Sequence, residues 1–212
     1  MADRLAQIYG TEKDKVNCSF YNKIGACRHG DKCARHHIKP SYSQTIICRN
    51  MYQNPENEPN NHLTPEEMKQ HFLAFYEDLF CECALFGKVE EMVVCENNND
   101  HLAGNVYVRF KYEEDAAKAC EKFNNRWYDK RPIYCELSPV TDFSEACCRQ
   151  HETKDCKRGG FCNFIHAKRP PREFLRELQL EQLRSLKDKG KTDDLNDSDS
   201  ESDSEFRSRR RR

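Results

Sequence analysis

Hydrophobic and polar residues along the middle of the chain follow the periods of strands and helices. Four strands are predicted, at residues 45–52, 89–95, 104–110 and 131–137. Two amphipathic helices are predicted, one from Thr64–Pro65 to just before Gly87 and one over 113–123. The order β-α-β-β-α-β is the split βαβ plan, in which two helices cover one face of a four-stranded antiparallel sheet. We therefore predict an α+β fold for this central block.

The segments on either side of the block have weaker patterns. Residues 2–9 predict one short helix, and residues 171–189 predict a charged helix with a weak apolar stripe. Residues 192–205 are Asp, Ser and Glu with almost nothing apolar, which predicts disorder, and a short arginine run follows. The expected units are a helix with a first metal segment (1–42), the central block (43–142), a second metal segment (143–170), a helix (171–190) and a tail (191–212).

Two copies of one cysteine–histidine pattern lie in the flanking segments. The first copy consists of Cys18, Cys27, Cys33 and His37, with eight, five and three residues between successive members. The second copy consists of Cys148, Cys156, Cys162 and His166, with seven, five and three. Three thiolates and one imidazole form a closed tetrahedral ligand set for structural Zn²⁺. Because each segment is too short to bury a core of its own, two zinc ions are expected to fold them.

The neighbouring residues leave two ligand choices open. His36 adjoins His37, and Cys147 adjoins Cys148; choosing Cys147 would give the second copy an interval of eight, like the first. We favour His37 and Cys148 because they reproduce the zinc-finger pattern. A catalytic zinc keeps an open coordination position, whereas three cysteines and a histidine fill the shell. The sequence also lacks a His-x-Glu deaminase signature, so we predict structural metals and no enzyme activity.

The other cysteines mostly fall on apolar stripes and are predicted to be small buried hydrophobic residues. They are Cys48, Cys81, Cys83, Cys95, Cys120, Cys135 and Cys147. The odd total of 13, together with the lack of an apolar signal stretch at residues 1–10, favours a reducing intracellular compartment. No apolar run approaches the roughly 20 residues of a membrane span, so no membrane partner is predicted.

The formal net charge of −1 hides an uneven distribution. Residues 13–39 carry seven Lys or Arg against two Asp or Glu, and residues 149–172 again carry seven against two. Residues 43–138 carry ten basic against seventeen acidic residues. A polyanion should therefore bind the two metal segments and avoid the central block.

Aromatic and basic residues are interleaved in both metal segments. The first contains Phe20, Tyr21, Arg28 and Arg35, and the second contains Arg149, Phe161, Phe164 and Lys168. Aromatic rings can stack on unpaired bases, at roughly 1–3 kcal/mol per base, while Arg and Lys hold phosphate. At least one ring is expected to pack on the zinc core instead. The combination in both copies predicts binding of single-stranded RNA.

The central block has the strand and helix order of an RNA recognition motif but lacks most of its base-stacking residues. The third-strand pattern of that motif begins K/R-G-F/Y, and here it reads Ala103, Gly104, Asn105. In the first strand, Ile46 is followed by Ile47 where an aromatic residue is expected. A sheet without these rings, in an acidic domain, is predicted to bind RNA poorly.

Other residues of the block suggest a peptide-binding surface. The first helix places Glu77, Asp78 and Glu82 off its apolar stripe. The loop after the second helix contains Arg126-Trp127-Tyr128, which holds the one Trp of the chain. An indole in a polar loop is a typical interface anchor. The alternatives are a solvated acidic helix face and a Trp packed in the core.

Several stretches resemble the small subunit of the U2 snRNP auxiliary factor, a family of splicing proteins. These are Gly-Thr-Glu-Lys-Asp-Lys-Val-Asn-Cys-Ser-Phe-Tyr at 10–21, Lys-Ile-Gly-Ala-Cys-Arg-His-Gly-Asp at 23–31, Asn-Val-Tyr-Val at 105–108, Glu-Leu-Ser-Pro-Val-Thr-Asp-Phe at 136–143, Glu-Ala-Cys-Cys-Arg-Gln at 145–150 and Arg-Gly-Gly-Phe-Cys-Asn-Phe at 158–164. The resemblance covers roughly residues 1–180. It implies a nuclear, non-catalytic spliceosome subunit whose central domain is a U2AF-homology motif, a variant recognition fold that binds protein ligands.

The resemblance also implies roles for individual residues. In the family, both zinc fingers together read the AG dinucleotide of the pre-mRNA 3′ splice site, and the matching candidates are Phe20, Arg28, Arg35, Arg149, Gln150 and Phe164. The loop and the acidic helix cradle a tryptophan of the large subunit of the auxiliary factor. Arg126 would pair with that helix, Tyr128 would replace the usual Phe, and Trp127 would enter a proline-rich stretch of the partner.

Two departures from the family pattern limit the resemblance. Ala34 stands where the family often has Ser after the third cysteine, so the preference for bases flanking AG is expected to differ. The long Arg-Ser tail of animal members is replaced by the acidic serine stretch.

Rival functions are an mRNA-decay factor, whose two fingers lie close together, or another finger-and-recognition-motif spliceosomal protein. Here 110 residues separate His37 from Cys148, and the sheet has lost its aromatic platform.

Overall fold

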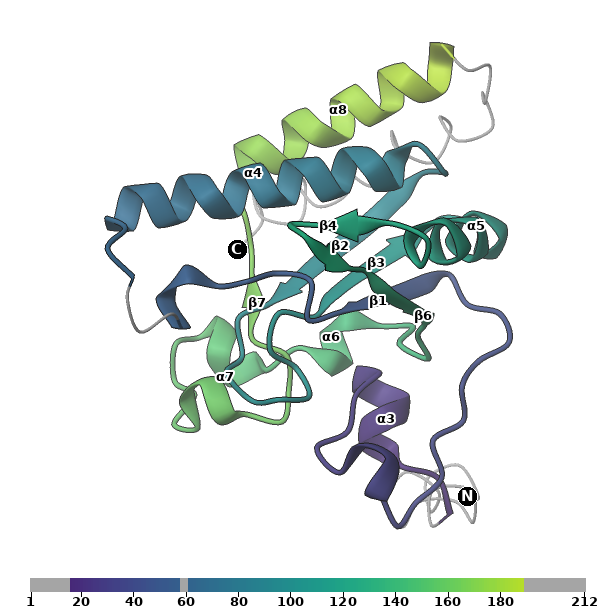
Figure 1. Ribbon diagram of the computed structural model, residues 1–212, viewed down its shortest axis with the longest axis vertical. Coiled ribbons are helices and arrows are strands. Elements are labelled where there is room, and N and C mark those ends of the chain that lie inside the picture. Colours follow the sequence, from purple (N-terminus) through teal and green to yellow (C-terminus); the bar gives the residue numbers. More distant parts are fainter. Residues whose placement is uncertain (1–15, 58–60, 189–212) are drawn as a thin grey trace, which may run out of the picture.

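A computed structural model describes residues 16–57 and 61–188 of the chain (Figure 1). Its centre is a five-stranded antiparallel sheet in the order β6-β1-β3-β2-β7. The strands are β1 Thr45–Arg49, β2 Val89–Cys95, β3 Val106–Phe110, β6 Tyr134–Leu137 and β7 Ala167–Lys168. A separate hairpin pairs β4 Trp127–Tyr128 with β5 Arg131–Pro132. The predicted mixture of helices and an antiparallel sheet is confirmed.

Two long helices and one shorter helix lie on one side of the sheet. They are α4 Pro65–Ala84, α5 Glu113–Phe123 and α8 Arg172–Asp188, and α8 packs along α4 (Figure 1). α4 begins as predicted: the Thr64 hydroxyl accepts a hydrogen bond from the Glu67 amide, and the Glu67 carboxylate accepts one from the Thr64 amide. This capping box satisfies backbone groups that a helix start leaves unpaired.

The opposite side of the sheet is covered by the two cysteine–histidine segments, which we call finger 1 (residues 16–39) and finger 2 (residues 147–168). Finger 1 contains α3 Ser19–Ile24 and the short turn η1 Gly30–Lys32. Finger 2 contains α7 Arg149–Glu152 and the turn η3 Gly159–Phe161. The short helix α6 Phe143–Ala146 precedes finger 2, and η2 Pro55–Asn57 follows β1. Figure 1 shows α3, α6 and α7 together below the sheet, away from α4 and α8.

The sheet therefore separates two apolar cores. The first core lies between the sheet and helices α4 and α5, and it includes Phe75 and Val108. The second lies on the finger side, where Ile47 and Tyr107 of the sheet pack with Ile24 of finger 1 and Ile165 of finger 2. The face that an RNA recognition motif uses for bases is thus buried inside the protein.

Side-chain amides close both edges of the sheet. Beyond the short β7, the outer edge of β2 is met by Gln182 of α8, which accepts from the Val89 amide at 2.8 Å and donates to the Val89 carbonyl at 3.0 Å. On the outer edge of β6, Asn124 makes the same pair of bonds with the Cys135 backbone, at 2.9 Å and 2.8 Å. Unpaired strand edges invite association with other chains, and these two amides block them.

The structure differs from the sequence prediction in the bounds of two strands, in the number of strands in the sheet and in the burial of one cysteine. β1 ends at Arg49 because Asn50 has φ 46°, outside the strand region. The strand predicted over 131–137 is split, since its first residues pair with β4 in the hairpin. All four predicted strands are present, but the prediction of a four-stranded sheet was wrong, because β7 of finger 2 adds a fifth strand beside β2. Cys81 is exposed rather than buried.

Some of the remaining secondary-structure predictions are confirmed, and others fall on residues that the structure does not describe. The second strand and the second helix have the predicted bounds, and the C-terminal helix lies within its predicted range. The helix predicted over 2–9 and the disorder predicted over 192–205 fall outside the described residues. Among the described residues, no helix has both the length and the apolar character to cross a bilayer.

The Gln182 contact predicts a stability effect. Replacing Gln182 with Ala should lower the free energy of unfolding by about 1–3 kcal/mol, because two buried backbone groups of Val89 lose their partners. The exposed Gln179 of the same helix is a matched control, and Gln179→Ala should change it by less than about 0.5 kcal/mol. Urea denaturation measures both. Equal effects of the two substitutions would show that the edge contact contributes nothing.

Candidate metal centres and nucleic-acid interface

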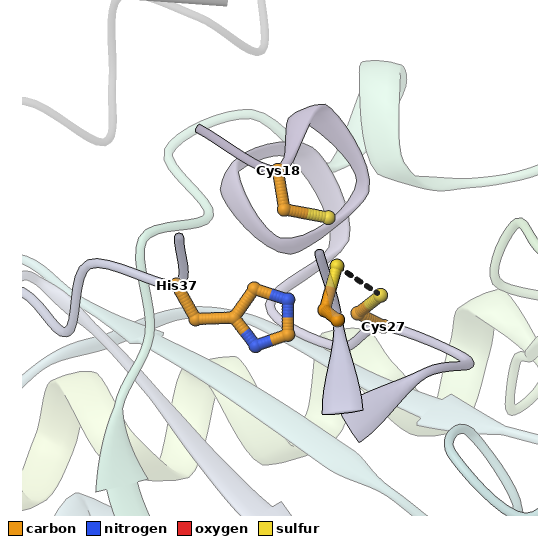
Figure 2. A group of neighbouring side chains, drawn as sticks. Cys18, Cys27 and His37 are labelled. Atoms are coloured by element: carbon orange, nitrogen blue, oxygen red, sulfur yellow. Dashed lines mark hydrogen bonds between the residues drawn. The ribbon is translucent and has the colours of Figure 1, made fainter. Parts of the chain in front are cut away.

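Finger 1 brings its four predicted ligands together. The ligand atoms of Cys18, Cys27, Cys33 and His37 all lie within 4.8 Å of one another. Figure 2 shows the side chains of Cys18, Cys27 and His37 directed toward a common point. The sulfur atoms of Cys27 and Cys33 are 3.8 Å apart.

Finger 2 repeats this arrangement. The ligand atoms of Cys148, Cys156, Cys162 and His166 lie within 4.8 Å of one another. The Cys148 sulfur is 3.8 Å from the sulfur of Cys156 and 3.8 Å from that of Cys162. Cys162 and His166 are buried.

Both clusters fit a zinc ion. Zinc–sulfur bonds of about 2.3 Å in a tetrahedron place two sulfur atoms about 3.8 Å apart. The Nε2 atoms of His37 and His166 are buried and have no hydrogen-bond partner, which is costly for a polar atom unless it binds a metal. Burial raises the pKa of the Cys27 and Cys148 thiols to about 11, so metal loading must displace protons.

The packing decides between the neighbouring ligand candidates. Cys148 belongs to the cluster, whereas Cys147 is buried in the second core with Ile165 and Ala146. His36 is exposed, and its backbone pairs with Val16 and Cys18 instead. The interval of seven residues in finger 2 is therefore compatible with the same cluster as the interval of eight in finger 1.

The two fingers share further local structure. In each, the amide of the first cysteine donates to a backbone carbonyl just before the ligand histidine: Cys18 to His36 at 2.9 Å and Cys148 to Ile165 at 2.8 Å. A ring three residues after that cysteine stacks on the ligand histidine. In finger 1, Tyr21 lies 4.5 Å from His37 between ring centroids. In finger 2, the ring of His151 lies 4.0 Å from that of His166. The expected packing of an aromatic residue on the zinc core thus falls on Tyr21.

Finger 2 is attached to the sheet by an asparagine that lies just beyond the end of β2. The buried Asn97 donates through Nδ2 to the carbonyls of Cys162 and Phe164, at 3.1 and 3.0 Å. Its Oδ1 accepts from the His166 amide at 2.8 Å. The neighbouring Asn99 also donates to the Cys162 carbonyl, at 2.6 Å. An asparagine two residues after a buried strand was the available signal, but its partners lie far along the chain.

Two of the six RNA-binding candidates meet at the junction of the fingers. The rings of Phe20 in finger 1 and Phe164 in finger 2 lie 6.2 Å apart between centroids, tilted by 59°. Phe20 is 40% exposed and Phe164 is partly exposed. The other four candidates, Arg28, Arg35, Arg149 and Gln150, have exposed side chains. Among the described residues, none of these three arginines forms an ion pair.

The partner-binding candidates lie on the helical side of the sheet. Trp127 is 70% exposed, which excludes the alternative of a core Trp. Arg126 forms an ion pair with Glu82 of α4, as expected from the resemblance. The Tyr128 hydroxyl lies 3.5 Å from the Asp78 carboxylate, and its ring packs edge-on against Phe75. Glu77 is exposed, and among the described residues the loop's hydrogen bond and ion pair go to Asp78 and Glu82 instead.

Comparisons with known proteins agree with this arrangement. A family model described as zinc finger C-x8-C-x5-C-x3-H type (and similar) matches residues 13–39 and 142–168, and the RNA recognition motif model matches residues 76–134. The splicing factor U2AF 23 kDa subunit of Schizosaccharomyces pombe is 63% identical over 187 residues, which are 88% of this chain and 87% of that protein.

Two animal proteins show a similar degree of likeness. The splicing factor U2af 38 kDa subunit of Drosophila melanogaster is 54% identical over 87% of this chain and 74% of its own length. The splicing factor U2AF 26 kDa subunit of Homo sapiens is 51% identical over 84% of each chain. The chain belongs to the U2AF small-subunit family. The resemblance found in the sequence is therefore confirmed, as is a recognition motif between two zinc-finger regions.

Membership of the U2AF small-subunit family makes this chain a splicing factor with two zinc-finger regions and a recognition motif. The Cys and His clusters are those of the family's finger pattern, with seven residues in the first interval of finger 2. Three cysteines and one histidine in each cluster leave no open position on a tetrahedral ion. The metals would therefore hold the fingers in shape.

Metal content tests the ligand assignment in finger 2. The unaltered protein should bind two zinc ions, Cys148→Ser should bind about one, and Cys147→Ser should keep both, because Cys147 packs in the core. Native mass spectrometry with elemental analysis counts the ions. The assignment is wrong if Cys147→Ser loses a zinc ion and Cys148→Ser keeps both.

Proposed function

We propose that this protein binds the AG dinucleotide at the 3′ splice site through both fingers and forms a heterodimer with the large U2AF subunit through the helical side of its recognition motif. It would act in the nucleus, as a non-catalytic subunit that helps to recruit the U2 snRNP. The observation that carries the RNA part is the contact between Phe20 and Phe164, which joins the two fingers into one surface.

The chemistry of this surface suits unpaired RNA. Two adjacent, partly exposed rings from different fingers offer faces on which bases can stack. Exposed arginines on both fingers provide charge for the phosphates. Because Phe20 and Phe164 come from separate fingers, a dinucleotide bound between them would need both metal clusters intact.

The chemistry of the helical side suits a peptide. The exposed indole of Trp127 stands beside the ion pair of Arg126 with Glu82, so an apolar anchor is bordered by charge. Interfaces typically combine an aromatic anchor with a polar rim. Since this surface and the fingers lie on opposite sides of the sheet, one molecule can hold the partner and the RNA together (Figure 1).

Ring removal tests the RNA surface. Phe164→Leu and Phe20→Leu should each weaken binding to a short RNA containing AG by about tenfold, because a stacking face is lost while apolar bulk remains. Phe161 is a matched control in finger 2, since its ring is 75% exposed and makes no ring contact with finger 1. Fluorescence anisotropy with AG and CG RNAs measures the affinities.

Two outcomes of this experiment would contradict the proposal. If Phe161→Leu weakened AG binding as much as Phe164→Leu, any exposed ring would serve, and the junction between the fingers would have no special role. If the unaltered protein bound AG and CG RNA equally, the proposed specificity would be wrong.

Removal of the indole tests the partner surface. Trp127→Ala should weaken binding of the large subunit by about thirtyfold or more, as for an interface hot spot, and should leave RNA affinity of the isolated protein unchanged. Tyr134→Ala is the control, because Tyr134 is 63% exposed on β6 and lies outside the loop. Isothermal titration calorimetry measures both variants. Unchanged affinity for Trp127→Ala would remove the anchor role.

A further inference from the structure

The two fingers are attached to the sheet very differently. Finger 2 extends the sheet through β7, and Asn97 alone makes three hydrogen bonds to its backbone. The amides of Glu96 and Asn98 also donate to its carbonyls, at His166 and Gly160. Finger 2 is therefore held as a rigid part of the central domain.

Finger 1 has a single buried polar link. Within the part of the chain that the structure describes, one hydrogen bond joins residues 16–38 to the rest: the Tyr107 hydroxyl donates to the Ile24 carbonyl at 2.5 Å. Two ion pairs are also present, Lys23 with Glu145 at 3.5 Å and Lys39 with Glu136 at 3.2 Å, but both lysine side chains are more than half exposed. Exposed pairs of this kind contribute little to orientation. The remaining attachment is apolar, through Ile24 and Ala26 in the second core and through the ring contact of Phe20 with Phe164.

The link lies where it controls the helix of finger 1. Ile24 is the last residue of α3, and the carbonyls at a helix end have no partner within the helix. The next residue, Gly25, has φ +72°, and a Cβ there would lie 2.6 Å from the Ser138 hydroxyl and 3.2 Å from the Tyr107 ring. The end of α3 is thus pressed onto the sheet at Tyr107, in a position that only glycine allows.

The same helix carries the RNA-binding side of finger 1. Phe20 is on α3, and Tyr21 stacks on the ligand His37. Fixing the end of α3 therefore sets where Phe20 lies relative to Phe164, whose carbonyl is held by Asn97. The pair of rings is assembled from two anchors, one for each finger.

We propose that Tyr107 is a positioning residue for RNA recognition: its hydroxyl fixes the orientation of finger 1, so that Phe20 meets Phe164 of finger 2. Tyr107 occupies the position of a base-stacking aromatic residue in the recognition-motif pattern, but here it is fully buried and binds the finger instead of RNA. This inference rests on the proposed binding of AG RNA by the paired fingers.

Removing one oxygen atom tests the inference. Tyr107→Phe deletes the hydroxyl and leaves the ring in the core. The matched control is Tyr76→Phe, because the buried Tyr76 hydroxyl donates to the Met92 carbonyl at 3.2 Å on the helical side of the sheet. Both variants should lose similar thermal stability and keep two zinc ions. Only Tyr107→Phe should weaken AG binding, by roughly tenfold, and lower the preference for AG over CG.

A second measurement reports orientation without RNA. Amide residual dipolar couplings of the whole protein compare α3 and α7 with the strands of the sheet. In Tyr107→Phe, couplings in α3 should be averaged to smaller values, while those in α7 should stay as in the unaltered protein. Tyr76→Phe should change neither.

Each outcome decides one claim. Unchanged α3 couplings in Tyr107→Phe would overturn the positioning role. Altered couplings with unchanged AG affinity and preference would overturn its link to RNA recognition. If the unaltered protein failed to prefer AG over CG, the proposed function would fall, and the couplings would still show whether Tyr107 orients finger 1.

Discussion

The structure depends on a sheet that is apolar on both faces and must be covered on both. Ile47, Val93 and Tyr107 point away from α4 and α5, and each is almost completely buried. The cover consists of α6 and the two fingers, which supply Ile24 and Ile165. Each finger is too small to fold on a core of its own, so metal and sheet act together. The recognition-motif surface that would otherwise bind bases has become an internal contact.

Metal ligands and core residues are close neighbours along the chain, so the two kinds of interaction are coupled. Ile165 directly precedes the ligand His166, and Cys147 of the core directly precedes the ligand Cys148. In finger 1, α3 starts after the ligand Cys18 and ends in the buried Ile24. A zinc ion that fixes these ligands also directs the adjacent apolar side chains into the second core. Bound metals would thus contribute to the central domain as well as to the fingers.

Local patterns explain which features could be predicted from the sequence. The strand over Val89–Cys95 and the helix over Glu113–Phe123 follow from periodicity, and the two ligand sets follow from spacing. β7 has two residues, which is too short for any period to be recognised. The choice between Cys147 and Cys148 also needed the packing, because adjacent residues point in different directions. The hydroxyl of Tyr107 and its partner Ile24 are 83 residues apart, and the Gln182 contact spans 93; such pairs are set by the tertiary fold alone.

The arrangement of charge follows the same division of the sheet into two sides. The acidic excess belongs to the central block, and the basic excess belongs to the fingers, which lie together on one face. Repulsion of phosphate by the first and attraction by the second act in the same direction, so a polyanion would be guided to the finger side. On the other side, Glu82 and Asp78 are engaged with Arg126 and Tyr128 of the loop that presents Trp127. Because the sheet between the two surfaces is buried on both faces, each surface can be occupied without unfolding or uncovering the other.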